Sequence, residues 1–581
     1  MSLRLRLSLF ALLAPAALIG AGCGSGSTGT TVDPASAVPA SAALYAGAVV
    51  RPEGALQKAA QTAGSTLTHQ RDPYLRLLGA LQTPGSPRPD FEHDVAPWLG
   101  PRAGVFLSSV GSNAGSSEAA IAKLLTLVEQ GLLGTTPSTG SFPFAAHSVE
   151  GAIVLDTRDV AKARSFLQAL AKRAKAQTSS YRGISYQVAS GIAFGVVARL
   201  AVIGTEPALH SVIDTASHGG LSLAHSPGYA KLQAAAPTGT LAHIYANPGA
   251  ISEATGEKAN AQGVGSVLSL LGGQRLLNVS LIPSNTSLAL DIDAAAPDSG
   301  AGSAGLLSAS PEASQMLGEL PGESWFAVGL GNVGSTLGAN ADALGSIGSL
   351  GSLLTGTTAP ATPAAGLSVP GLLEGLLKPL SVLGAGTAEA KRDFTSWMGS
   401  AGLFVSGTGL LELKGGVVID SKDPVRSRAA VPKLAAKLRA DGGSVQRISI
   451  RGTEAAVAAH LSGLPVVLDI ADGRDSSGAV KFVIGIGEQS VEAALSPSST
   501  LSGAASYGTA SAALGEGSHP SVLVEFPTLL GLLEGVGLSE DPTVAPLVPY
   551  LRSLTTLSGG GTKLSSGIER FRLVLGLQGS G

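Results

Sequence analysis

The chain carries the same landmarks twice in the same order, and this repetition constrains its fold more than any other feature. An Asp, a Trp and a Gly recur at identical spacing, first as Asp94, Trp98 and Gly100 and then as Asp393, Trp397 and Gly399. A strand-like run that ends in an acid follows each set, at 151–156 with Asp156 and at 415–420 with Asp420. Several landmarks in one order indicate a tandem duplication of a single folding unit.

Length and composition set the expected boundaries of these units. At 581 residues the chain is too long for one ordinary domain. A stretch rich in Ala, Gly and Ser lies between the copies and is typical of a flexible linker. The expected organisation is a signal peptide at 1–22, a flexible tether at 23–38, a first repeat at 39–293, a linker at 294–310 and a second repeat at 311–581. The repeats could share one continuous sheet or stand separately in tandem.

Each copy mixes strand and helix patterns. In the first copy, strand-like runs follow one another at 183–189, 192–198 and 200–204. Alternation of apolar and polar residues in such runs is typical of a sheet with one buried face. Helical spacing extends over 53–82, and a further helix is expected to begin at Asp156. The predicted fold class is therefore α+β, with each repeat a largely antiparallel sheet that has helices packed on one side.

The first thirty residues predict where the protein is located. Arg4 and Arg6 precede a short apolar run at 7–19, and small residues lead to Cys23, the only cysteine in the chain. This order is typical of an export signal, and the run is shorter than the roughly twenty residues that span a membrane. The segment resembles the lipobox of bacterial lipoproteins, although Gly20 stands where an aliphatic residue is usual. The resemblance implies that Cys23 is lipidated and that the protein is exported and anchored to the outer face of the cell membrane. Ordinary signal cleavage is the rival interpretation.

Charge and cysteine content exclude several classes of function. Without Arg4 and Arg6, the 38 bases fall to 36 against 41 acids, and this mild acidity is spread along the chain. We therefore expect no nucleic-acid partner. With Cys23 lipidated, the mature body has no thiol, which excludes disulfides, thiolate catalysis and cysteine metal sites.

Histidines provide the one conceivable metal site. None of the nine histidines lies in an H-E-x-x-H pair. His210, His218 and His225 are closely spaced, with Asp214 between them. Because the second copy has no histidine in the matching stretch, we favour surface imidazoles near a helix end and expect no metal and no cofactor.

The repeated acids and tryptophans have structural interpretations. Asp94 and Asp393 could be acids in a cleft, but we favour the interpretation that each makes a polar contact at a helix end beside a buried aromatic. Trp98 and Trp397 are then core anchors. Asp156 and Asp420 are interpreted as N-caps, because each precedes an amphipathic helix pattern.

The landmarks around Pro39, at 94–100 and at 151–156 resemble those of bacterial proteins grouped as domain of unknown function 3352. This resemblance implies an exported or membrane-attached protein, and it carries no catalytic residues to transfer. The usage of Ala, Gly and Arg is similar to that of high-GC actinobacterial proteins.

No nucleophile elbow, phosphate loop or dinucleotide fingerprint occurs in the chain. The leading hypothesis is therefore a non-enzymatic, lipid-anchored envelope protein that binds a partner or acts as a scaffold. One alternative is a carrier of lipid or another hydrophobic ligand. In this case the Leu-rich region at 331–383 would gate an apolar cavity rather than only cover the core. The other alternative is a hydrolase whose His, Asp and Ser come from distant segments.

Overall fold

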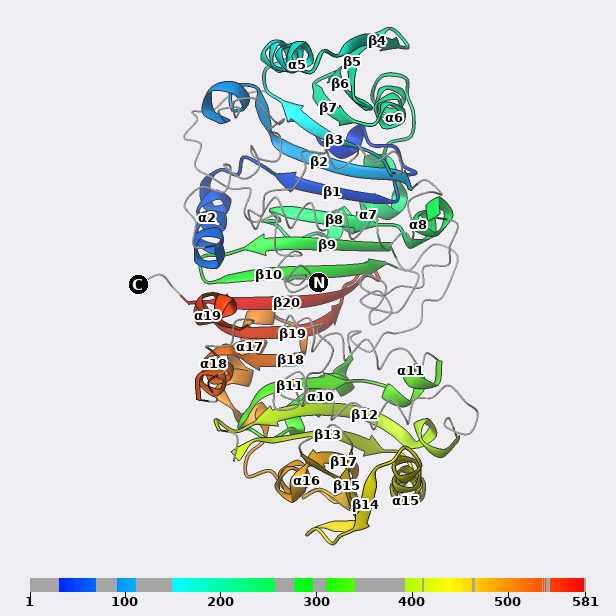
Figure 1. The fold of residues 1–581 in the computed structure, drawn as a ribbon, viewed down its shortest axis with the longest axis vertical. Coiled ribbons are helices and arrows are strands. Elements are labelled where there is room, and N and C mark those ends of the chain that lie inside the picture. Colours follow the sequence, from blue (N-terminus) through cyan, green and yellow to red (C-terminus); the bar gives the residue numbers. More distant parts are fainter. Residues whose placement is uncertain are drawn as a thin grey trace.

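The computed structural model describes residues 31–68, 91–110, 149–255, 276–295, 310–339, 392–409, 412–461, 466–535, 537, 539 and 544–578. Within these residues, twenty strands form one sheet in which all neighbouring strands are antiparallel (Figure 1). Helices pack against this sheet, so the predicted α+β class with a largely antiparallel sheet is confirmed. Cys23 and the predicted helices at 69–82, 117–133 and 340–383 lie outside the described residues.

The first half of the chain, residues 31–295, contributes ten strands. They are β1 (Leu44–Val49), β2 (Leu99–Val110), β3 (Val149–Thr157), β4 (Gln177–Tyr181), β5 (Ile184–Ala189), β6 (Ile192–Val197), β7 (Leu200–Gly204), β8 (Ala242–Ala246), β9 (Leu276–Pro283) and β10 (Ser287–Ala295). From the outer edge inward their order is β4-β5-β6-β7-β3-β2-β1-β8-β9-β10.

The second half, residues 310–578, contributes the other ten. They are β11 (Ser324–Leu330), β12 (Met398–Ser406), β13 (Lys414–Ser421), β14 (Ser444–Arg447), β15 (Thr453–His460), β16 (Val467–Arg474), β17 (Val480–Ile486), β18 (His519–Glu525), β19 (Leu554–Lys563) and β20 (Glu569–Leu577). Their order from the outer edge is β14-β15-β16-β17-β13-β12-β11-β18-β19-β20, which is the order of the first half.

The two halves meet where β10 pairs with β20. The register runs from Ser287 opposite Gly576 to Ala294 opposite Glu569. This pairing decides between the two arrangements that the sequence left open, because it makes the sheet continuous across both halves. The innermost strand of each half would otherwise be an unpaired edge.

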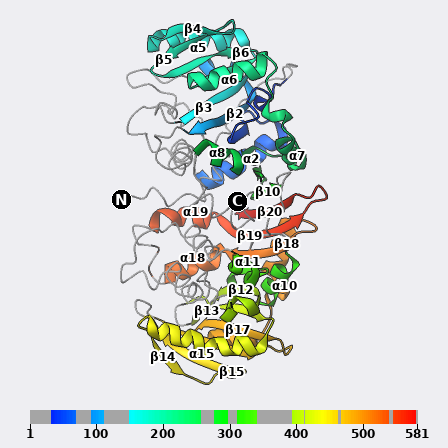
Figure 2. The same ribbon diagram turned by 90° about the vertical axis from the view of Figure 1, so that its right-hand side faces the viewer.

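Helices cover both faces of the sheet (Figure 2). They are α2 (Gly54–Thr68), α5 (Val160–Ala174), α6 (Glu206–Ser217), α7 (Pro227–Ala235), α8 (Pro248–Thr255), α10 (Pro311–Glu319), α11 (Val333–Ala339), α15 (Pro424–Ala440), α16 (Gly487–Leu495), α17 (Ala505–Leu514), α18 (Phe526–Gly535) and α19 (Val548–Arg552). Core clusters with α2, α5, α15 and α18 lie on one face, and clusters with α6, α7, α10 and α16 lie on the other.

The prediction that helices pack on one side only is therefore wrong. Every residue of β7 and of β11 is buried, so these strands have apolar side chains on both faces and need cover on both. In the described part of the Leu-rich region, Val333 and Leu337 of α11 are buried in the main core, which supports the core interpretation of that part.

Residues 34–38 correct the C-terminal end of the predicted tether. Residues 34–36 form a short 3-10 helix, in which the Asp33 side chain accepts a hydrogen bond from the amide of Ala35. Ala35 and Val38 are 0% exposed and pack against strands and helices of the first half. The tether at 23–38 is therefore too long by several residues, because apolar side chains after Thr31 are buried in the body.

Local boundaries correct two further predictions. Helix α5 begins at Val160 and its N-cap is Asp159, whereas Asp156 lies inside β3. The expected strand at 564–567 is a turn, because β19 ends at Lys563. In the described residues, no helix is both long enough and apolar enough to span a membrane.

Candidate functional site

Among the described residues, the two carboxylates with the deepest burial, Asp291 and Asp293, lie at the junction of the two halves. Along β10, Leu288, Leu290 and Ile292 enter the main hydrophobic core, and the intervening Asp291 and Asp293 face the opposite side of the sheet. Along β20, Phe571 and Leu575 enter the same core, and Arg570 and Arg572 alternate with them. We call Asp291, Asp293, Arg570 and Arg572 the central seam.

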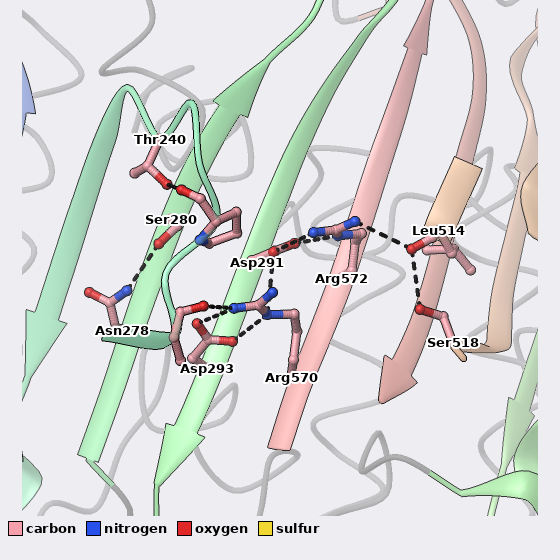
Figure 3. A network of polar contacts seen from close by, with 11 residues as sticks. Thr240, Asn278, Ser280, Asp291, Asp293, Leu514, Ser518, Arg570 and Arg572 are labelled. Atoms are coloured by element: carbon pink, nitrogen blue, oxygen red, sulfur yellow. Dashed lines mark hydrogen bonds and ion pairs between the residues drawn. The ribbon is translucent and has the colours of Figure 1, made fainter. Parts of the chain in front are cut away.

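Register places opposite charges across the seam. Asp291 lies opposite Arg572, and Asp293 lies opposite Arg570. Arg570 donates from Nε to Asp293 Oδ1 at 2.7 Å and from Nη2 to Oδ2 at 2.9 Å. Arg572 donates from Nε and Nη2 to the two oxygens of Asp291, both at 2.7 Å (Figure 3). Both aspartate side chains are 0% exposed, so each carboxylate depends on its arginine for solvation.

The same arginines also reach the ends of two helices. Arg570 Nη2 donates to the carbonyl of Ala235, the last residue of α7, at 2.6 Å. Arg572 Nη1 donates to the carbonyl of Leu514, the last residue of α17, at 3.4 Å. Cations are favourable at helix C-termini, where carbonyl groups have no partner within the helix. The central seam therefore joins one helix of each half as well as two strands.

Strand β9 extends the polar network into the first half. Asn278 lies opposite Asp293 and Ser280 lies opposite Asp291. Asn278 accepts from Gln233 Nε2 at 3.0 Å and donates to Ser280 Oγ at 3.0 Å. These amide and hydroxyl groups therefore provide one another with hydrogen-bond partners.

Burial and charge pairing both affect the pKa values of the seam residues. Burial raises the pKa of Asp293, and the hydrogen bonds and charge of Arg570 oppose that rise. Hydrogen bonds to Asp291 raise the pKa of Arg572. Both oxygens of each carboxylate already accept bonds from arginine, so the arrangement holds the two halves together and specifies their register.

The repeated tryptophans are buried, as expected for core anchors. Trp98 is 2% exposed and Trp397 is 0% exposed. The indole of Trp98 donates to the main-chain carbonyl of Asp94 at 2.8 Å, and the indole of Trp397 donates to that of Asp393 at 3.1 Å. The predicted polar contact at each Asp is thus present and uses the backbone oxygen, while the Asp393 carboxylate pairs with Lys433.

The interpretation of Asp156 and Asp420 as N-caps is wrong. Both lie near the ends of strands, and the caps are Asp159 and Asp423, whose side chains accept from first-turn amides. Each strand acid instead packs against a repeated glycine, Gly100 beside Asp156 and Gly399 beside Asp420. A Cβ at Gly100 would collide with the Asp156 carboxylate, whereas a Cβ at Gly399 would lie 3.1 Å from Asp420 and would need only a small shift of that residue.

The two strand acids differ in their partners. Asp156 is 2% exposed, its Oδ1 has no hydrogen-bond partner, and burial raises its pKa. Asp420 bonds Lys481 Nζ at 2.5 Å, and the same ammonium bonds Glu319 at 2.7 Å. The halves therefore share the position of the acid but not its environment.

The three grouped histidines have separate partners. His210 Nε2 lies 2.8 Å from the hydroxyl of Tyr186, and its ring stacks on Tyr181. His225 Nδ1 lies 2.7 Å from Ser222 Oγ, a contact across one short turn. Among the residues that the structure describes, no group of three or more His, Cys, Asp or Glu could hold a metal ion.

Sequence reasoning missed the central seam and a histidine in the first half. His243 Nε2 lies 3.0 Å from the hydroxyl of Tyr229, and both rings pack near Tyr45. Burial lowers the pKa of His243 to about 4, while Asp33 acts to raise it and Arg102 to lower it. The sequence signal for the seam was the presence of charged residues at alternate positions of the otherwise apolar strands β10 and β20.

Comparisons with known proteins place the chain in a family without giving it an activity. No curated protein matches the chain. Crystal form I of TP0453 matches at 10% identity with a TM-score of 0.24, covering 46% of this chain and 81% of that chain. Crystal form III of TP0453 matches at 10% identity and a TM-score of 0.24, covering 46% and 82%. The family described as "Protein of unknown function (DUF3352)" matches residues 9–573, so the chain belongs to the DUF3352 family.

Proposed function

We propose that this protein is an exported, lipid-anchored scaffold that binds a partner at the outer face of the cell membrane without catalysing a reaction. One observation carries the proposal. Ala35 and Val38 are already fully buried in the first half, and Cys23 lies only twelve residues before Ala35 along the chain.

The short tether determines where the body works. Residues 24–31 are rich in Gly, Ser and Thr, a composition typical of linkers, and a linker of eight residues would span about 15 Å. Lipid on Cys23 would therefore hold the first half of the sheet close to the bilayer. A protein held there meets lipids and other envelope proteins before distant soluble molecules.

We infer that the two halves arose by tandem duplication. The shared strand order and the matched pairs of Trp98 with Asp94 and Trp397 with Asp393 support this inference. The central seam then turns two copies into one long platform, which suits a scaffold.

The anchor is tested by replacing Cys23 with Ser and separating membrane from soluble fractions. We expect the wild-type protein in the membrane fraction, labelled by radioactive palmitate, and the Cys23→Ser variant unlabelled and released. Ser25→Ala, in the same tether, is the matched control and should behave as the wild type. Retention of the unlabelled Cys23→Ser variant as firmly as the wild type would refute the anchor.

A further inference from the structure

The positive charge of this chain is concentrated rather than evenly spread, contrary to the expectation from composition. Between residues 160 and 182 there are six bases and no acid. The six are Lys162, Arg164, Lys172, Arg173, Lys175 and Arg182, and all six are exposed. The chain as a whole has more acids than bases, and this segment reverses that balance.

The fold places five of these bases on helix α5 and at its C-cap, at one end of the molecule (Figure 1). Helix α5 packs against β6 and β7 near the outer edge of the first half, with Ala163, Leu167 and Ala171 buried. Arg182 does not belong to this group, because it pairs with Asp214 of α6, which packs on the other face of the sheet. We call the five exposed bases, Lys162, Arg164, Lys172, Arg173 and Lys175, the α5 patch.

Most of the α5 patch has no partner of opposite charge. Lys162 pairs with Asp159 at 3.5 Å. No ion pair joins the other four bases to any residue in the described part of the chain. Unpaired like charges repel one another, so their clustering costs stability unless an external anion compensates.

The favourable position of cations at a helix C-terminus explains only some of the bases in the patch. Lys172 and Arg173 lie in the last turn of α5, where cations are favourable next to the free carbonyl groups. This explanation does not extend to Arg164, which lies in the first half of the helix.

The matching helix of the second half provides a contrast. Helix α15 and the strand after it carry seven bases and one acid between residues 424 and 451. Several of these bases are neutralised internally: Lys433 pairs with Asp393 at 2.9 Å, Arg426 pairs with Asp423 at 3.3 Å, and Arg428 pairs with Glu454. On α15 itself, Lys437 and Arg439 have no ion pair in the described part of the chain, compared with Arg164, Lys172 and Arg173 on α5. The helix of the half that begins beside Cys23 is thus the less neutralised of the two.

We propose that the α5 patch binds the anionic headgroups of phospholipids and so orients the first half against the membrane. The proposal rests on the proposed function for the location of the protein at a bilayer. Charge complementarity selects an anionic surface, because each Lys or Arg near such a surface strengthens binding. Five separate cations on a surface helix and its C-cap suit many mobile headgroups. A single-stranded nucleic acid would favour aromatic side chains that stack on bases, and the only aromatics in the segment are Phe166, packed on the core, and Tyr181, stacked on His210.

The test uses the full chain with Cys23→Ser, so that no lipid anchor contributes, and measures sedimentation with vesicles. We expect binding to phosphatidylcholine vesicles that contain phosphatidylglycerol, little binding to phosphatidylcholine alone, and loss of binding as NaCl is raised. Arg173→Gln with Lys175→Gln should weaken binding about twentyfold, since each base contributes roughly a factor of five. Arg447→Gln with Arg451→Gln, two exposed bases of the second half, removes equal charge and should leave binding within about twofold.

Three results would overturn the proposal: equal loss with both double variants, equal binding to neutral vesicles, or tighter binding to DNA or heparin than to anionic vesicles. Thermal unfolding of each variant shows that the body remains folded. The two proposals can be refuted independently. Palmitate labelling of Cys23 tests the anchor, and vesicle binding without lipidation tests the α5 patch.

Discussion

Arg570 holds both carboxylate oxygens of Asp293, a residue 277 positions earlier in the chain. This contact joins the last strand of the second half to the last strand of the first half, with the aspartate side chain fully buried. With the neighbouring pair of Arg572 and Asp291, it makes the two halves into one sheet.

Replacement of Arg570 by Ala should destabilise the protein by about 3–5 kcal/mol, because Asp293 would remain charged and buried without a partner. Urea unfolding measures this change. Arg552→Ala is the matched control: its pair with Glu534 is largely exposed, and its loss should cost less than about 1 kcal/mol.

A second variant separates the buried charge from the arginine itself. Asp293→Leu together with Arg570→Met removes both charges and should be more stable than Arg570→Ala alone, since no unpaired ion is left. If the double variant were less stable than the single one, the ion pair would not be the reason for the loss.

Trp98 and Trp397 should make similar contributions to the free energy of unfolding. Trp98→Phe and Trp397→Phe each remove an indole donor and leave a backbone carbonyl without its bond, at a cost of about 1–3 kcal/mol. The sites lie in different halves, so the double variant should lose the sum of both. Thermal unfolding checks this, and a large loss at one site with none at the other would mean that the halves are not built alike.

His243 should make stability depend on pH. Its pKa is about 4 in the folded protein and 6.5 in an unfolded chain, so the unfolded state binds more protons between these values. The stabilising contribution is complete above pH 6.5 and is lost as the pH falls toward 4, with a total of about 3 kcal/mol. His243→Gln should flatten the dependence of urea midpoints on pH over this range. His460→Gln, at an exposed position, should leave the profile as in the wild type.

The corrected helix caps can be separated from the strand acid beside one of them. Asp159→Ala and Asp423→Ala should each cost about 1 kcal/mol, because first-turn amides lose their acceptor. Asp156→Asn should instead stabilise the protein at neutral pH.

The reason for this opposite sign is burial. The raised pKa of Asp156 means that the folded state holds a proton more tightly than the unfolded state, so stability is lost as the pH rises through the folded pKa. An amide of the same shape has no charge to bury, and its advantage should disappear at acidic pH. A loss at neutral pH equal to that of Asp159→Ala would restore the cap assignment.

Local patterns predicted the elements of the fold well where neighbours along the chain decide them. The strands at 184–189, 192–197 and 200–204 lie within one residue of their expected bounds, and Trp98 and Trp397 are buried as expected. The predicted N-cap of α5 is three residues early, because both Asp156 and Asp159 are capping residue types and only backbone geometry distinguishes them.

By itself, the sequence determined the α+β class, the repeated landmarks and the family resemblance, because spacing and alternation along the chain report local geometry directly. Only the tertiary structure decided that β10 pairs with β20, that helices cover both faces, and that the bases of α5 stay exposed at one end of the sheet. The physical reason is that pairing between distant strands depends on burial and charge matching across hundreds of residues. Asp293 and Arg570 satisfy each other only when the whole sheet has closed.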